Sequence, residues 1–153
     1  EAQLTAMNVP VTPPSYPSLP RLRLLLVDDT AQVRHDLRQL LELSGEIEIV
    51  AEAGNGQEAV RLAASLAPEV VLMDLEMPVM NGYEATRQIK SQFPAMRVVI
   101  LSVHAGDKER ENARIAGADR FIVKGVRYKV LLNAILARED ASNLVDPPKG
   151  ANT

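Results

Sequence analysis

The chain has 153 residues, enough for one self-supporting domain, and carries a net charge of −3. This charge argues against a surface that binds nucleic acid as a whole, and three tyrosines and two phenylalanines leave few rings on which bases could stack. The absence of cysteine excludes disulfides, thiol nucleophiles and thiolate metal sites, and fits a reducing compartment such as the cytoplasm. No apolar run approaches the ~20 residues that cross a bilayer, so we expect no contact with a membrane.

The two ends of the chain differ in composition from the middle. Five of the ten prolines fall within residues 1–20, which predicts an extended, disordered tail or an expression remnant. Residues 139–153 are typical of a linker that is cut short. We therefore expect one folded domain over residues 21–138.

Short apolar runs alternate with helical patterns across this domain. Runs rich in Val, Ile and Leu predict strands buried on both faces at 22–27, 70–73, 98–101 and 121–123. The more polar, alternating run 46–50 predicts an edge strand. Apolar spacing and terminal Gly or Pro residues predict helices at 30–44, 57–66, 83–92, 108–116 and 127–136. Five such alternations predict an α/β fold, a doubly wound parallel sheet with helices on both sides.

A polar residue follows each of the four buried strands directly. In chain order these residues are Asp28 with Asp29, then Asp74, Ser102 and Lys124. The carboxyl ends of parallel strands meet at one edge of the sheet, where ligands bind in such folds. We therefore expect these side chains to converge into one site.

Three carboxylates at one place would repel one another. Two unit charges ~5 Å apart cost ~3 kcal/mol at an effective dielectric constant of ~20, and Lys124 offers only one cation. Mg²⁺ would balance the rest, because it is typically held by one or two carboxylates, waters and a phosphate. The plainer alternative is that Asp29 and Thr30 only cap the following helix.

The same side chains suit phosphoryl transfer. The transferred group spreads negative charge over its equatorial oxygens, and catalysis consists mainly of positioning and charge neutralisation. Mg²⁺, the Lys124 ammonium and the Ser102 hydroxyl can each hold one oxygen. Asp74 is alone on its strand and faces the acid pair, so it is the best candidate for the nucleophile.

Several motifs closely resemble the receiver domain of two-component response regulators: LLLVDD, VVLMDLEMPVMNG, VVILS and AGADRFIVKG. The resemblance covers residues 21–138 and is strongest to receivers of helix-turn-helix, LuxR-type regulators. It implies a flavodoxin-like receiver fold with strand order 2-1-3-4-5. It also implies phosphorylation of Asp74 by a sensor histidine kinase, in the cytoplasm, and control of transcription through a DNA-binding output domain outside this chain.

The resemblance also implies a role for each residue of the predicted site. Mg²⁺ would be bound by Asp28, Asp29, Asp74 and the backbone carbonyl of Glu76. The phosphoryl group would contact Ser102 and Lys124. Such a domain is not an enzyme in the ordinary sense, although it assists its own phosphorylation and dephosphorylation.

Other positions bear on the switch that phosphorylation would cause. Phe121, where the family commonly has tyrosine, would change rotamer with Ser102 as the face formed by 108–116, 121–123 and 127–136 rearranges. Helix 108–116 is nearly all charged or small, with Ile115 its only large apolar residue, so it should be loosely held. Gly125 stands where the family often has proline.

The side chains of Glu76 and His104 lie two residues after Asp74 and Ser102. In the family these places flank the path of the hydrolytic water, so the two side chains would tune the lifetime of the phosphorylated state. The alternative is that both are exposed loop residues without a role.

Other functions stay open at this point. The chain could be a stand-alone receiver in a phosphorelay, a homodimer, or a phosphate-independent interaction module. A Mg²⁺-dependent phosphatase with an aspartyl nucleophile is a further alternative, although such enzymes usually need a cap that encloses the substrate. The stretch 54–59 fits the dinucleotide pattern G-x-G-x-x-A, but Glu58 would place a negative charge where a pyrophosphate should bind.

Overall fold

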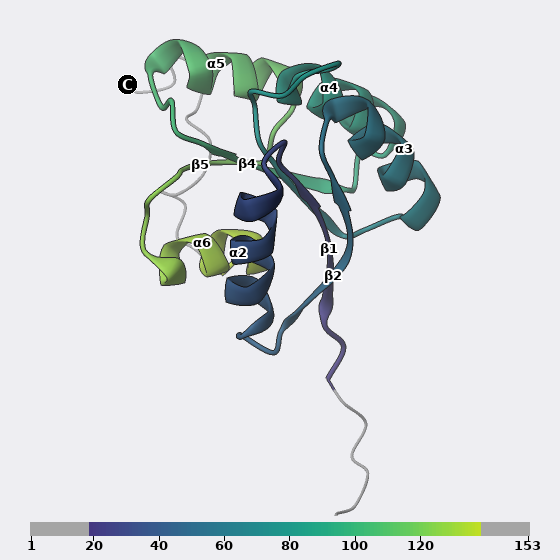
Figure 1. Ribbon diagram of the computed structural model, residues 1–153. Coiled ribbons are helices and arrows are strands. Elements are labelled where there is room, and N and C mark those ends of the chain that lie inside the picture. The colour runs from purple at the N-terminus through teal and green to yellow at the C-terminus, as the bar shows by residue number, and fades with distance from the viewer. Residues whose placement is uncertain (1–18, 139–153) are drawn as a thin grey trace, which may run out of the picture.

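The computed structural model describes residues 19–138 as a five-stranded parallel sheet with helices on both sides (Figure 1). The elements in chain order are β1 (Leu22–Val27), α2 (Ala31–Glu42), β2 (Ile47–Ala53), α3 (Gly56–Leu66), β3 (Val70–Met73), α4 (Gly82–Gln92), β4 (Arg97–Ser102), α5 (Asp107–Ala116), β5 (Arg120–Val123) and α6 (Tyr128–Leu136). The strand order β2-β1-β3-β4-β5 confirms the predicted topology. The predicted linker and most of the predicted tail lie outside the described residues.

The sheet separates two apolar layers. Figure 1 shows α2 and α6 on one side of the sheet and α3, α4 and α5 on the other. Along β1, Leu24 and Leu26 pack with the first layer, whereas Leu25 and Val27 pack with the second. This alternation follows from the two-residue period of a strand, and it explains why the central strands are apolar throughout.

The edge strand β2 is longer than the sequence predicted. It continues past residue 50 to Ala53, although Glu52 is charged. The Glu52 carboxylate accepts hydrogen bonds from Arg34 and Arg38 on α2, at 3.1 and 2.7 Å. These partners lie on the neighbouring helix, so the local pattern of the strand did not reveal them.

Helix α5 is attached to the sheet by small side chains. Its buried residues are Ala113 and Ala116, while Ile115 is 68% exposed. In α4, by contrast, Ile89 is completely buried. A small apolar contact area contributes little free energy, so α5 has less packing to hold it in place. None of the helices between residues 19 and 138 is long and apolar enough to cross a bilayer.

Candidate functional site

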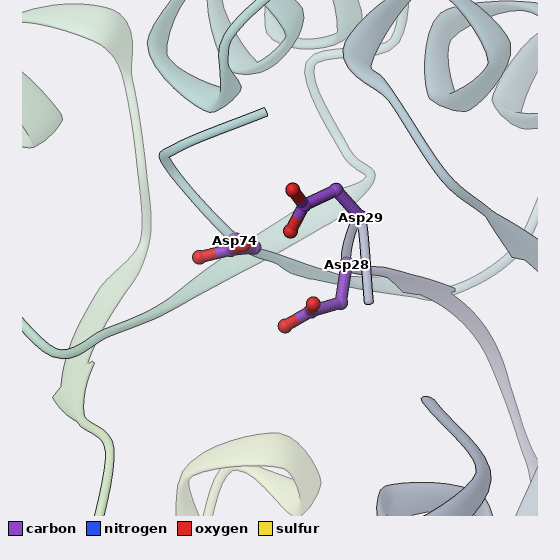
Figure 2. Close-up of side chains that lie close together, drawn as sticks. All are labelled: Asp28, Asp29 and Asp74. Atoms are coloured by element: carbon purple, nitrogen blue, oxygen red, sulfur yellow. The ribbon is translucent and has the colours of Figure 1, made fainter. Parts of the chain in front are cut away.

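Three carboxylates meet at the carboxyl edge of the sheet (Figure 2). Asp28 and Asp29 follow β1, Asp74 follows the adjacent strand β3, and one oxygen of each lies within 4.8 Å of the others. Asp28 and Asp74 are buried, whereas Asp29 is exposed to solvent. The parallel pairing of β1 with β3 creates this cluster, because it brings the two strand ends side by side.

Lys124 extends from the end of β5 into the cluster. Its Nζ lies 3.0 Å from Oδ2 of Asp28 and 3.5 Å from Oδ1 of Asp74. Burial by itself lowers the pKa of Lys124, but the hydrogen bond to Asp28 and the charges of both acids outweigh it and raise this pKa. The lysine is therefore a cation that bridges two of the three acids.

One cation does not neutralise the cluster. Burial and the charge of Asp28 together raise the pKa of Asp74 to about 6, against the opposing effects of Lys124 and the Leu75 N–H. Burial disfavours the charged form of a carboxylate, and a neighbouring negative charge disfavours it as well. Oxygen ligands of this number and charge fit a hard divalent cation such as Mg²⁺.

Asp28 is held at four of its atoms. Its N–H donates to the Ala53 carbonyl at 3.1 Å and its Oδ1 accepts from the Thr30 N–H at 2.9 Å. Its Oδ2 binds Lys124, and its backbone carbonyl accepts from Nη1 of Arg34 at 2.6 Å. Arg34 was not among the predicted site residues, because its only signal in the sequence is an arginine within the first two turns of the helix that follows the acids.

The simpler interpretation of Asp29 and Thr30 is not supported by the helix start. Thr30 is the N-cap of α2, but its side chain makes no capping hydrogen bond. Its hydroxyl instead donates to Oδ1 of Asp29 at 3.4 Å. The two residues therefore do not cap α2 through their side chains.

The loop after β3 is fitted closely against its surroundings. A Cβ on Gly82 would lie 2.1 Å from the Asp74 carbonyl oxygen, and one on Gly56 would lie 2.4 Å from that of Met80. Gly56 also donates its N–H to the Met80 carbonyl at 2.9 Å, and Asn55 caps α3 through the Glu58 N–H at 2.8 Å. Within the G-x-G pattern, Gly56 thus allows the backbone at the start of α3 to lie close to the backbone of this loop.

Ser102 lies at the end of β4, beside a polar cavity of about 440 Å³. Its Oγ accepts a hydrogen bond from the His104 N–H at 3.1 Å. His104 and Glu76 also line this cavity; Nε2 of His104 lies 3.2 Å from Oε1 of Glu76, and both side chains are mostly exposed. The predicted residues Ser102, Glu76 and His104 are thus neighbours on the β4 side of the cluster.

Phe121 is buried in the layer below α5, and Arg110 of that helix lies over its ring at 5.0 Å from the centroid. Arg110 also donates to the Ala105 carbonyl at 3.3 Å, which links the ring to the loop after Ser102.

Gly125 follows Lys124 with φ +99°, a left-handed conformation that favours glycine. The family's proline at this place could not adopt that conformation, because its ring fixes φ near −65°.

Comparisons with known proteins show to which family the chain belongs. The family model for the response regulator receiver domain matches residues 24–136. The response regulator protein VraR of Staphylococcus aureus is 36% identical over 126 residues, 82% of this chain and 60% of VraR. The chain thus spans about 60% of the length of the curated relatives it matches.

Two solved structures illustrate the similarity. A LuxR-family two-component response regulator from Aurantimonas sp. SI85-9A1 matches with a TM-score of 0.74 and 37% identity, over 77% of this chain and 84% of that one. A chain of the CheX-CheY-BeF3-Mg+2 complex from Borrelia burgdorferi matches with a TM-score of 0.70 and 27% identity, over 78% and 90%. The chain therefore belongs to the response regulator receiver domain family, and LuxR-type response regulators are among its homologues.

Proposed function

We propose that this receiver domain is a phosphorylatable switch, in which Asp74 accepts a phosphoryl group from a sensor histidine kinase in the cytoplasm. One observation carries the proposal: three carboxylates and one lysine share a partly buried site, and the buried Asp74 has a pKa of about 6. Such an arrangement has more negative than positive charge. A bound divalent cation would balance this charge and would allow an anionic group to bind beside it. The Mg²⁺ and BeF3 named for the Borrelia burgdorferi complex, a structural relative, agree with this interpretation.

The residues of this chain would divide the work. The Asp74 Oδ1 accepts from the Leu75 N–H at 2.9 Å and lies 3.5 Å from Nζ of Lys124, while Oδ2 takes part in neither of these interactions and would attack phosphorus. Lys124 would hold one phosphoryl oxygen and the Ser102 hydroxyl would donate to another. Mg²⁺ bound by Asp28, Asp29, Asp74 and the Glu76 carbonyl would neutralise the remaining charge on the transferred group.

The test is the intact mass of the protein after incubation with a small acyl phosphate. We expect one phosphoryl adduct per chain, dependent on Mg²⁺, absent from Asp74→Asn and retained in the surface control Asp36→Asn. Continued release of inorganic phosphate without a stable adduct would favour the aspartyl phosphatase instead. An unchanged mass with Mg²⁺ and donor present would overturn the proposal.

The second part of the proposal concerns the output. Phosphorylation would rearrange the face formed by α5, β5 and α6, through Ser102 and Phe121, and so control transcription by a DNA-binding domain outside this chain. The weak anchoring of α5 and the link from Ala105 through Arg110 to Phe121 support this route. Amide hydrogen exchange in α5 should change when beryllofluoride and Mg²⁺ are added, while exchange in α4 stays the same. Equal exchange in α5 with and without beryllofluoride contradicts this part.

The exposed pair of Glu76 and His104 would set the lifetime of the phosphorylated state. The two side chains are in contact and line the same cavity as Ser102, through which a hydrolytic water would approach. We expect Glu76→Ala and His104→Ala to change the dephosphorylation rate without preventing phosphorylation. Decay at the wild-type rate in both variants would assign the pair no role.

A further inference from the structure

Arg34 on α2 bonds directly to the backbone between the two adjacent acids. Its Nη1 donates to the Asp28 carbonyl at 2.6 Å, and its Nε donates to Glu52 on β2 at 3.1 Å. The Arg34 side chain is only 20% exposed, which limits competition from water. One guanidinium therefore connects a helix and the edge strand to the end of β1.

The carbonyl that Arg34 holds has a particular importance. It belongs to the planar peptide group that joins Asp28 to Asp29, so its orientation constrains the backbone torsions on both sides. The Asp28 carboxylate has two further partners, Thr30 and Lys124. The exposed Asp29 carboxylate, by contrast, has within the described residues only the Thr30 hydroxyl at 3.4 Å. The direction in which Asp29 points thus depends mainly on its backbone.

We propose that Arg34 is a positioning residue for the metal site: by holding the Asp28 carbonyl it fixes the peptide that carries Asp29, and so presents both carboxylates to one cation. The proposal rests on the proposed function, since it requires that the acid cluster bind Mg²⁺. Arg34 itself does not bind the cation, because a guanidinium is positively charged and has no acceptor atom; its Nη1 and Nε bond Asp28 and Glu52. A bond from a charged donor is among the stronger hydrogen bonds in proteins, which suits this purpose.

Arg38 provides a matched control. It lies one turn later on α2, also bonds Glu52, at 2.7 Å, and is similarly half-buried, but its remaining partner is Glu42. Arg34→Met and Arg38→Met thus remove the same charge and a bond to the same carboxylate, and only Arg34→Met frees the Asp28 carbonyl. Charge alone acts in the opposite direction, since the loss of a nearby cation should strengthen Mg²⁺ binding.

The experiment is a calorimetric titration of the metal-free proteins with MgCl₂. We expect Arg34→Met to raise the Kd for Mg²⁺ about fivefold to tenfold, which corresponds to ~1 to 1.4 kcal/mol, and Arg38→Met to leave it within about twofold. A second measurement needs no metal: the amide resonance of Asp29, whose N–H lies in the held peptide, should shift in Arg34→Met and stay in place in Arg38→Met. Thermal melts establish that both variants are folded.

The outcomes separate the inference from the proposed function. The role of Arg34 is overturned if Arg34→Met binds Mg²⁺ with the wild-type Kd or a lower one, or if both variants lose the same amount of Mg²⁺ affinity. These results leave the proposed phosphorylation site intact. A wild-type protein that binds no Mg²⁺ removes the metal site and the inference together. If Arg34→Met does not fold, Arg34→Lys replaces it: it keeps the charge, and a wild-type Kd together with a displaced Asp29 resonance would likewise overturn the inference.

Discussion

The two flanks of the acid cluster are built in different ways. The acidic flank, made of β1, α2, β2 and the loop after β3, holds Asp28 at four atoms and fits Gly82 and Gly56 against backbone oxygens. The switch flank, made of β4, α5, β5 and their loops, attaches α5 through Ala113 and Ala116 and leaves Ile115 exposed. The difference indicates that Asp28 and the loop after β3 are held firmly, whereas fewer contacts hold α5 in place on the switch flank.

A substitution at Gly82 tests the close fit of the acidic flank and should have the strongest effect on stability. Gly82→Ala would place a Cβ 2.1 Å from the Asp74 carbonyl oxygen, which the backbone cannot tolerate without moving. We expect a loss of about 3 kcal/mol or more in the free energy of unfolding, measured by urea denaturation. Gly106→Ala on the switch flank is the counterpart, because its Cβ would meet only the flexible end of Glu109. A loss above about 1 kcal/mol in Gly106→Ala would contradict the comparison.

The next effect concerns the charge imbalance of the cluster. The pKa of Asp74 is raised from 3.8 to about 6, so the folded state binds this proton more tightly than the unfolded chain does. This tighter binding of the proton stabilises the folded state fully below pH ~4, and the stabilisation is lost as the pH rises through ~6. Without metal, Asp74→Asn should therefore be more stable than the wild type by about 1 to 2 kcal/mol at neutral pH, and no more stable below pH ~4.

Urea denaturation in EDTA at several pH values measures this difference. Asp36→Asn on the exposed surface of α2 is the control, since it changes the same chemical group away from the cluster. A gain from Asp74→Asn that is the same at all pH values would show that the repulsion in the cluster does not strain the fold.

A smaller effect is expected in the loop after β3. Val79 adopts φ +69°, and the Met80 N–H donates to the Pro78 carbonyl at 2.7 Å across it, a tight turn that is strained for a β-branched residue. Because Val79 is 76% exposed, its replacement loses little burial. Val79→Asn should raise the free energy of unfolding by about 1 kcal/mol, measured by thermal and urea denaturation. Val103→Asn, at an exposed valine without positive φ, should bring no such gain.

The smallest effect is expected in α5. Ile115→Ala should change the free energy of unfolding by less than about 0.5 kcal/mol, because the side chain is 68% exposed. Ile89→Ala in α4, where the same residue type is completely buried, should cost about 2 to 5 kcal/mol in the same denaturation assay. Similar losses in the two variants would mean that α5 is anchored as firmly as α4.

The alternation of strands and helices could be predicted from the amino-acid sequence, because apolar runs and helical spacing are local patterns. It also placed Asp28, Asp74 and Lys124 at strand ends, and a parallel sheet necessarily brings such ends to one edge. The resemblance to receiver domains supplied the strand order that puts β1 beside β3, and the structure has the same order.

The side chains that support the site could be identified only from the packing of the elements against one another. The extension of β2 through Glu52, the bond from Arg34 to the Asp28 carbonyl and the position of Arg110 over Phe121 all join residues of different elements. No local pattern encodes such contacts, because they depend on how a helix is placed against the sheet. The exposure of Ile115 also depends on how a helix is placed against the sheet. A helix can bury an isoleucine, but α5 packs so that Ile115 faces solvent.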